Sequence, residues 1–99
     1  MNRTYIPSHN SLRTERFYAT ILASSFQAIL YECDNEARSE IIFSFLPFHE
    51  DLGVGEDFLR TMLQDLGNKE EGSLGDFSAL LFTSPYVMNA LRKVIYGSF

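Results

Sequence analysis

The amino-acid sequence predicts an all-α protein, a compact bundle of four to five helices with a long central N-terminal helix and a C-terminal helix pair broken by proline. Three observations support this fold class: an uncharged run of fifteen residues from Phe17 to Tyr31, a four-residue apolar spacing between residues 54 and 66, and a Ser84-Pro85 pair typical of a helix start. The 99 residues suffice for one core. We expect an irregular arm over residues 1–10 and a single helical domain over residues 11–99.

The first helix is predicted to run from Leu12 to Cys33, with Asn10 or Ser11 as its N-cap. At 100° per residue, its apolar positions form one broad face that is suited to a core. This face consists of Tyr18, Ala19, Leu22, Ala23, Phe26, Ile29, Leu30 and Cys33.

A second apolar line follows the same helix at spacings of four, three, four and three residues, as in a heptad repeat. It passes through Phe17, Ile21, Ser24, Ala28 and Tyr31. The small residues at its centre would let another helix approach closely. We therefore predict an interaction surface at Phe17, Ile21, Ala28 and Tyr31, which contacts a second copy or a partner helix. The alternative is a central helix wrapped by its own chain.

Asp34-Asn35 followed by Glu36 predicts a break in the helix and a fresh N-cap. The segment that follows admits two interpretations. Ile41–Leu46 is apolar nearly all round as a helix and alternates weakly as a strand. We choose a helix, because Glu36, Ala37 and Arg38 favour one and a lone strand would have no mate in this chain. Pro47 is expected to end this helix, and residues 47–55 to form a loop.

The third helix is predicted from Glu56 to Leu66, with Gly67 as its C-cap and acidic residues in its first turn. Its inward stripe should be Val54, Phe58, Met62 and Leu66, widened by Leu59 and Leu63. A fourth helix has its body at residues 77–82, with Ser73 or Asp76 as its cap. The fifth should run from Pro85 to Tyr96, capped by Ser84 and stopped by Gly97.

Charge is distributed unevenly along the chain, whose net charge is −5. Residues 32–76 hold twelve acids against three bases, whereas residues 1–31 and 77–99 each have a net charge of +2. Direct binding to nucleic acid is disfavoured, because phosphate contacts need clustered Lys and Arg. This acidic segment is either a solvated face or a patch that binds a basic partner. The candidate residues of such a patch are Glu50, Asp51, Glu56 and Asp57.

No catalytic, cofactor-binding or metal-binding signature is evident, so we expect neither an enzyme nor a cofactor. His49 stands beside Glu50 and Asp51, but no second His or Cys lies at ligand spacing. Cys33, on the apolar face of the first helix, is expected to be a buried structural thiol.

We expect a cytoplasmic protein. A single cysteine excludes an internal disulfide, no secretory signal is evident, and the uncharged run falls short of the roughly 20 residues that a membrane span needs.

These observations favour a non-catalytic regulatory or assembly module, a homodimer that docks onto another protein without nucleic acid or membrane. The alternative is an acidic inhibitor, similar to phage-type antagonists, that occupies a basic nucleic-acid-binding surface of its target.

Overall fold

The computed structural model describes the backbone of residues 9–97 and the side chains of residues 15–97. Within this range the chain forms only helices: α1 (His9–Glu32), α2 (Asn35–Phe45), the 3₁₀ helix η1 (Leu46–His49), α3 (Glu56–Gly67), α4 (Ser73–Phe82) and α5 (Pro85–Tyr96). The predicted all-α bundle is confirmed, and the ambiguous segment after Asp34 is helical.

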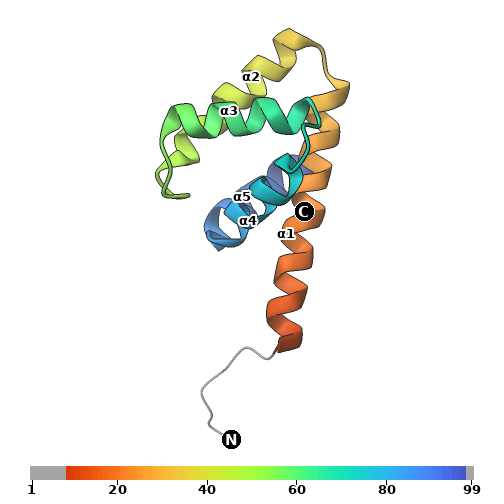
Figure 1. Cartoon of the computed structure of the whole chain (residues 1–99), viewed down its shortest axis with the longest axis vertical. Coiled ribbons are helices and arrows are strands. Elements are labelled where there is room, and N and C mark those ends of the chain that lie inside the picture. The colour runs from red at the N-terminus through yellow and green to blue at the C-terminus, as the bar shows by residue number, and fades with distance from the viewer. Residues whose placement is uncertain (1–8, 98–99) are drawn as a thin grey trace, which may run out of the picture.

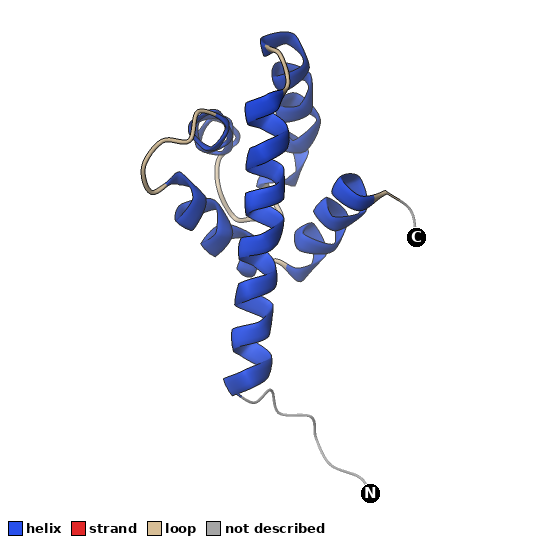
Figure 2. Cartoon of the chain, turned by 90° about the vertical axis from the view of Figure 1, so that its right-hand side faces the viewer, coloured by secondary structure: helices blue, strands red, loops and turns tan. Residues whose placement is uncertain are grey.

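The long helix α1 organises the bundle and contacts each of the other four α-helices. In Figure 1, α2 to α5 all lie to the left of α1. In Figure 2, seen from the right of that view, α1 stands in front of the other helices and its lower end projects beyond them. One side of α1 therefore carries the packing contacts, and within residues 9–97 no helix covers the opposite side.

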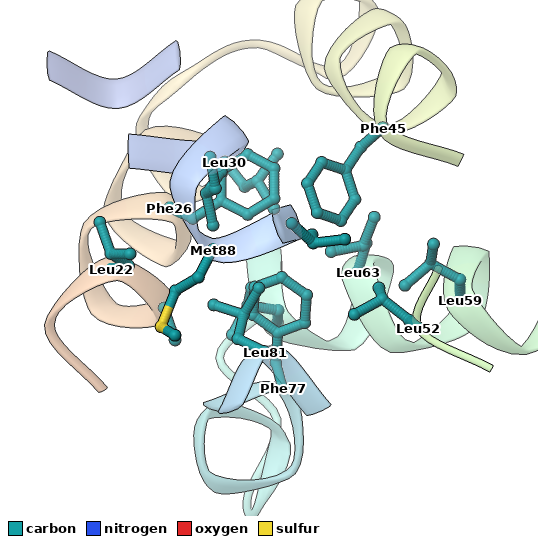
Figure 3. Close-up of a cluster of buried hydrophobic side chains, with 14 of the residues drawn as sticks. Leu22, Phe26, Leu30, Phe45, Leu52, Leu59, Leu63, Phe77, Leu81 and Met88 are labelled. Atoms are coloured by element: carbon teal, nitrogen blue, oxygen red, sulfur yellow. The ribbon is translucent and has the colours of Figure 1, made fainter. Parts of the chain in front are cut away.

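The core is rich in aromatic side chains, as nine phenylalanines in 99 residues lead one to expect. Phe26 of α1 lies 5.4 Å from Phe45 of α2 and 5.8 Å from Phe77 of α4, measured between ring centroids. Leucines of α1, α3 and α4 and Met88 of α5 surround these rings (Figure 3). Each such side chain stabilises the fold by about 1.5–3 kcal/mol when fully buried.

The start of α1 differs from the prediction. The helix begins at His9, so Asn10 and Ser11 lie inside it and neither is its N-cap. The polar residues His9–Ser11 show no apolar period, which is why the pattern missed them. Extending a formed helix by one turn costs little, because nucleation is the expensive step. The rest of the expected arm, residues 1–8, lies outside the described residues.

Two predicted helix starts are confirmed by their caps. The Asp34 carboxylate accepts a hydrogen bond of 2.8 Å from the amide of Ala37, and the Ser84 hydroxyl accepts one of 3.2 Å from the amide of Val87. Each satisfies an amide that the helix itself leaves without a partner. Pro85 follows Ser84 at the first helical position, so α4 and α5 form the proline-broken pair.

The predicted end of α2 just before Pro47 is confirmed, but the segment that follows is not simply a loop. The α-helix ends at Phe45 and passes directly into η1, where Pro47 occupies a first-turn position. Proline is tolerated there because its missing amide would have no partner in the first turn of a helix. The expected loop 47–55 is therefore a 3₁₀ helix followed by a turn.

Helix α3 is rotated relative to the predicted stripe. Its buried side chains are Leu59, Leu63 and Leu66, whereas Phe58 is 57% exposed and Met62 only half-buried. Gly67 is the last residue of α3, and the C-cap position predicted for it belongs to Asn68. Helix α4 likewise begins earlier than its predicted body, at Ser73, and its N-cap is Gly72.

Candidate interaction surfaces

The first candidate surface is the outer face of α1, defined by Phe17, Ile21, Ser24, Ala28 and Tyr31. All five side chains are exposed, with 66% for Phe17, 38% for Ile21 and 49% for Tyr31. At 100° per residue they occupy an arc roughly opposite to the buried residues of α1, such as Leu22 and Phe26. The outer face is thus a row of apolar and small side chains directed away from the core.

The neighbours of α1 hold it from both sides of this face. On one side the hydroxyls of Thr20 and Ser78 are 3.0 Å apart, which ties α1 to α4. On the other side the Ser25 hydroxyl lies 3.3 Å from the Tyr96 hydroxyl of α5. The outer face therefore belongs to a helix that is bonded to its neighbours along both flanks, and its side chains remain exposed within the described part of the chain.

The two ends of the outer face lie near cationic side chains. Lys69, from the loop after α3, has its amino group 4.1 Å from the centre of the Tyr31 ring. Arg16 lies one residue before Phe17 and stacks at 5.2 Å on Phe82 of α4. Both are cation–π contacts, and that of Lys69 places a positive charge over the Tyr31 end of the outer face.

The predicted acidic patch is exposed at all four positions, Glu50, Asp51, Glu56 and Asp57. The first two lie in the turn after η1 and the other two in the first turn of α3. Arg60 pairs with both Glu56 and Asp57, so this half of the patch is partly neutralised. Such exposed pairs contribute little stability, but they reduce the charge that the patch offers to a partner.

A second candidate surface is a groove of about 410 Å³ between α3 and the start of α4. The sequence pattern did not predict it. Its lining combines apolar and acidic side chains: Asp57, Phe58, Thr61, Met62, Asp65, Ser73 and Asp76. The helical spacing of Phe58, Thr61, Met62 and Asp65 indicates a single face. The pattern alone assigned that face to the core.

The polar residues considered for chemistry are accounted for locally. The ring Nδ1 of His49 donates to the carbonyl of Val54 at 2.9 Å and closes the turn after η1. Cys33, expected to be buried, is only half-buried, and its thiol lies 3.4 Å from the Leu30 carbonyl. Cys33 directly follows Glu32, the last residue of α1. Among residues 15–97, no three His, Cys, Asp or Glu side chains are grouped closely enough to hold a metal ion.

In the part of the chain that the structure describes, every helix is too short or too polar to cross a membrane. Comparison of the chain with protein-family models, with curated proteins and with solved structures found no match.

Proposed function

We propose that this protein is a non-catalytic protein–protein interaction module that docks through the outer face of α1, most simply onto the same face of a second copy. The observation that carries this proposal is the exposure of Phe17, Ile21 and Tyr31 in one row, opposite the core. Apolar side chains aligned along one helix mark an interaction surface far more strongly than the same residues scattered singly.

The spacing within the row supports a helix as the occupant. Residues 17, 21, 24, 28 and 31 repeat as in a coiled-coil seam and extend over about 21 Å of helix axis. Ser24 and Ala28 are small, so two helix backbones can approach closely at the middle of the row. Five side chains make a small interface compared with the usual 800 Å² per partner, so we expect a micromolar dissociation constant.

Sedimentation velocity over a range of protein concentrations tests this proposal. We expect the wild-type chain to dimerise at tens of micromolar, on the order of the expected affinity. Ile21→Asp and Ala28→Arg should yield monomers with unchanged helical circular dichroism, because both residues are exposed. A monomeric wild-type chain at these concentrations would overturn the self-contact version.

Val94→Asp is the matched control for Ile21→Asp. Val94 is 71% exposed on α5. It lies two residues before Tyr96, and so about 200° around the helix from the side that contacts α1. This variant introduces the same charge onto an exposed β-branched residue outside the outer face. It should sediment like the wild type, and a loss of the dimer in both variants would indicate a general effect of charge.

A second candidate function is the acidic inhibitor that occupies a basic, nucleic-acid-binding surface of its target. The exposure of Glu50 and Asp51, which are the unpaired half of the acidic patch among the described contacts, supports it. Salt separates the two functions: charge-driven binding should collapse between low and moderate ionic strength, whereas apolar docking should hardly respond.

A further inference from the structure

We propose that the groove between α3 and α4 binds an amphipathic helix of a different protein, with its apolar stripe on Phe58 and Met62 and its Lys or Arg side chains against the surrounding aspartates. This inference rests on residues outside the outer face of α1. It can therefore be tested independently of the proposed self-contact.

The apolar side chains that line the groove, Phe58 and Met62, both come from α3. Phe58 is 57% exposed although Leu59, the next residue, is fully buried. Met62 lies one turn further along, so the two side chains form a short apolar ridge at i, i+4 spacing. Methionine beside an exposed aromatic ring is suited to a binding surface, because its flexible side chain adapts to the shape of a partner.

The rim of the groove is acidic along its length. Asp57 and Asp65 are eight residues apart on α3, or about 12 Å along its axis, and Asp76 faces the groove from α4. No lysine or arginine is among the residues that line it. Arg60, the nearest cation on α3, pairs with Glu56 and Asp57. The carboxylates of Asp65 and Asp76 thus have no cation paired with them in the described part of the chain.

Charge complementarity identifies the occupant as a cationic helix. An apolar ridge flanked by carboxylates matches a helix with apolar anchors at i and i+4 and Lys or Arg on either side. A second copy of this chain fits poorly, because no helix within residues 9–97 carries more than two lysines and arginines. Two helices, α1 and α5, carry two such residues each. In α1, Arg16 stacks on Phe82, and in α5, Arg92 is bonded to Asn89.

The other large groove, between α2 and α3, is a weaker candidate for a binding site. It has about 470 Å³ and two arginines in its lining, Arg38 and Arg60. Arg38 donates to three oxygens of its own chain, and Arg60 is paired with two carboxylates. Both guanidiniums are already bonded within the chain, so this groove offers a ligand less free charge than the acidic groove does.

Fluorescence anisotropy with defined peptides tests the proposal on the full chain. The probe is a fluorescein-labelled helical peptide of about 18 residues, or some 27 Å, with a leucine stripe flanked by lysines. One control peptide replaces every lysine with glutamate, and another replaces every leucine with serine. We expect micromolar binding of the first peptide and at least roughly tenfold weaker binding of both controls. One control lacks the cationic side chains that would face the aspartates, and the other lacks the apolar side chains that would contact Phe58 and Met62. Absence of binding of the leucine–lysine peptide, or equal binding of the three peptides, would overturn the proposal.

Variants then locate the binding site. Phe58→Ala should weaken binding at least about tenfold, since an aromatic anchor is lost from an exposed position. The matched control is Phe43→Ala, which removes a 73% exposed phenylalanine of α2 outside this groove and should leave affinity within about twofold. Asp65→Asn with Asp76→Asn should weaken binding and flatten its salt dependence, whereas Glu36→Gln with Glu40→Gln should do neither.

The same titrations separate this inference from the proposed function. Ile21→Asp should bind the peptide as tightly as the wild type, whether or not the wild type dimerises. If Ile21→Asp abolishes binding and Phe58→Ala does not, the peptide occupies the outer face of α1 and the groove proposal is wrong.

Discussion

The guanidinium Nε of Arg38 donates a hydrogen bond of 2.9 Å to the main-chain carbonyl of Leu30, in the last turn of α1. The same guanidinium donates to the carbonyl of Gly67 at 3.3 Å and to the side chain of Asn68 at 2.7 Å, at the end of α3. Carbonyls at helix C-termini lack helical partners and carry partial negative charge. Arg38, on α2, therefore joins the C-terminal ends of two other helices.

Arg38→Met should destabilise the fold by about 2 kcal/mol, because it leaves these carbonyls without their charged donor while it keeps the aliphatic stem. Urea unfolding followed by circular dichroism measures the change. Arg92→Met is the matched control, since the bond of Arg92 to the described residues is to the side chain of Asn89 on its own helix. It should change stability by no more than about 0.5 kcal/mol. Equal losses in the two variants would contradict the role assigned to Arg38.

Gly67→Ala should also destabilise the fold, by about 1–2 kcal/mol, although alanine normally favours a helix. A Cβ at residue 67 would lie 3.1 Å from the Leu30 Cβ and 3.2 Å from the Arg38 guanidinium carbon, which is held by its own hydrogen bonds. A Cβ at Gly75, inside α4, would meet no such neighbour within 4 Å. Gly75→Ala should therefore stabilise by about 0.5–1 kcal/mol. Thermal unfolding of both variants tests the opposite signs.

Ser84→Ala should cost about 1 kcal/mol, because the hydroxyl that caps α5 is lost and the Val87 amide keeps no partner there. Ser84→Thr retains a hydroxyl and should recover most of the stability. Chemical denaturation of the two variants provides the comparison. Similar losses in both would mean that packing around residue 84, and not the cap, sets the effect.

Self-association through the outer face of α1 also predicts a concentration-dependent stability. If the native chain dimerises, the unfolding midpoint should rise with protein concentration, because association stabilises only the folded state. Scans over about a hundredfold range of concentration measure this, since each tenfold excess over the dissociation constant adds roughly 1.4 kcal/mol. In Ile21→Asp the midpoint should be constant. A constant midpoint in the wild type would argue against the dimer.

The starts of α2 and α5 and the one-sided core of α1 follow from the sequence alone. Ser84 followed by Pro85 marks a helix start by local chemistry, and so does Asp34 before Asn35. Likewise the spacing of Leu22, Phe26 and Leu30 identifies the buried side of α1, because the helical period of 3.6 residues depends only on the backbone. These features need no knowledge of distant residues.

Tertiary structure alone decided which of two neighbouring apolar faces α3 buries. On α3 the rows through Phe58 and Leu59 lie about 100° apart, and both satisfy the helical period. The direction in which α1, η1 and α4 approach α3 selects the leucines and leaves Phe58 at the groove. The roles of Arg38 and Gly67 could not be predicted from the sequence either. Arg38 and Gly67 meet the end of α1 from two other helices, α2 and α3, and the pattern of any one helix does not show such a contact.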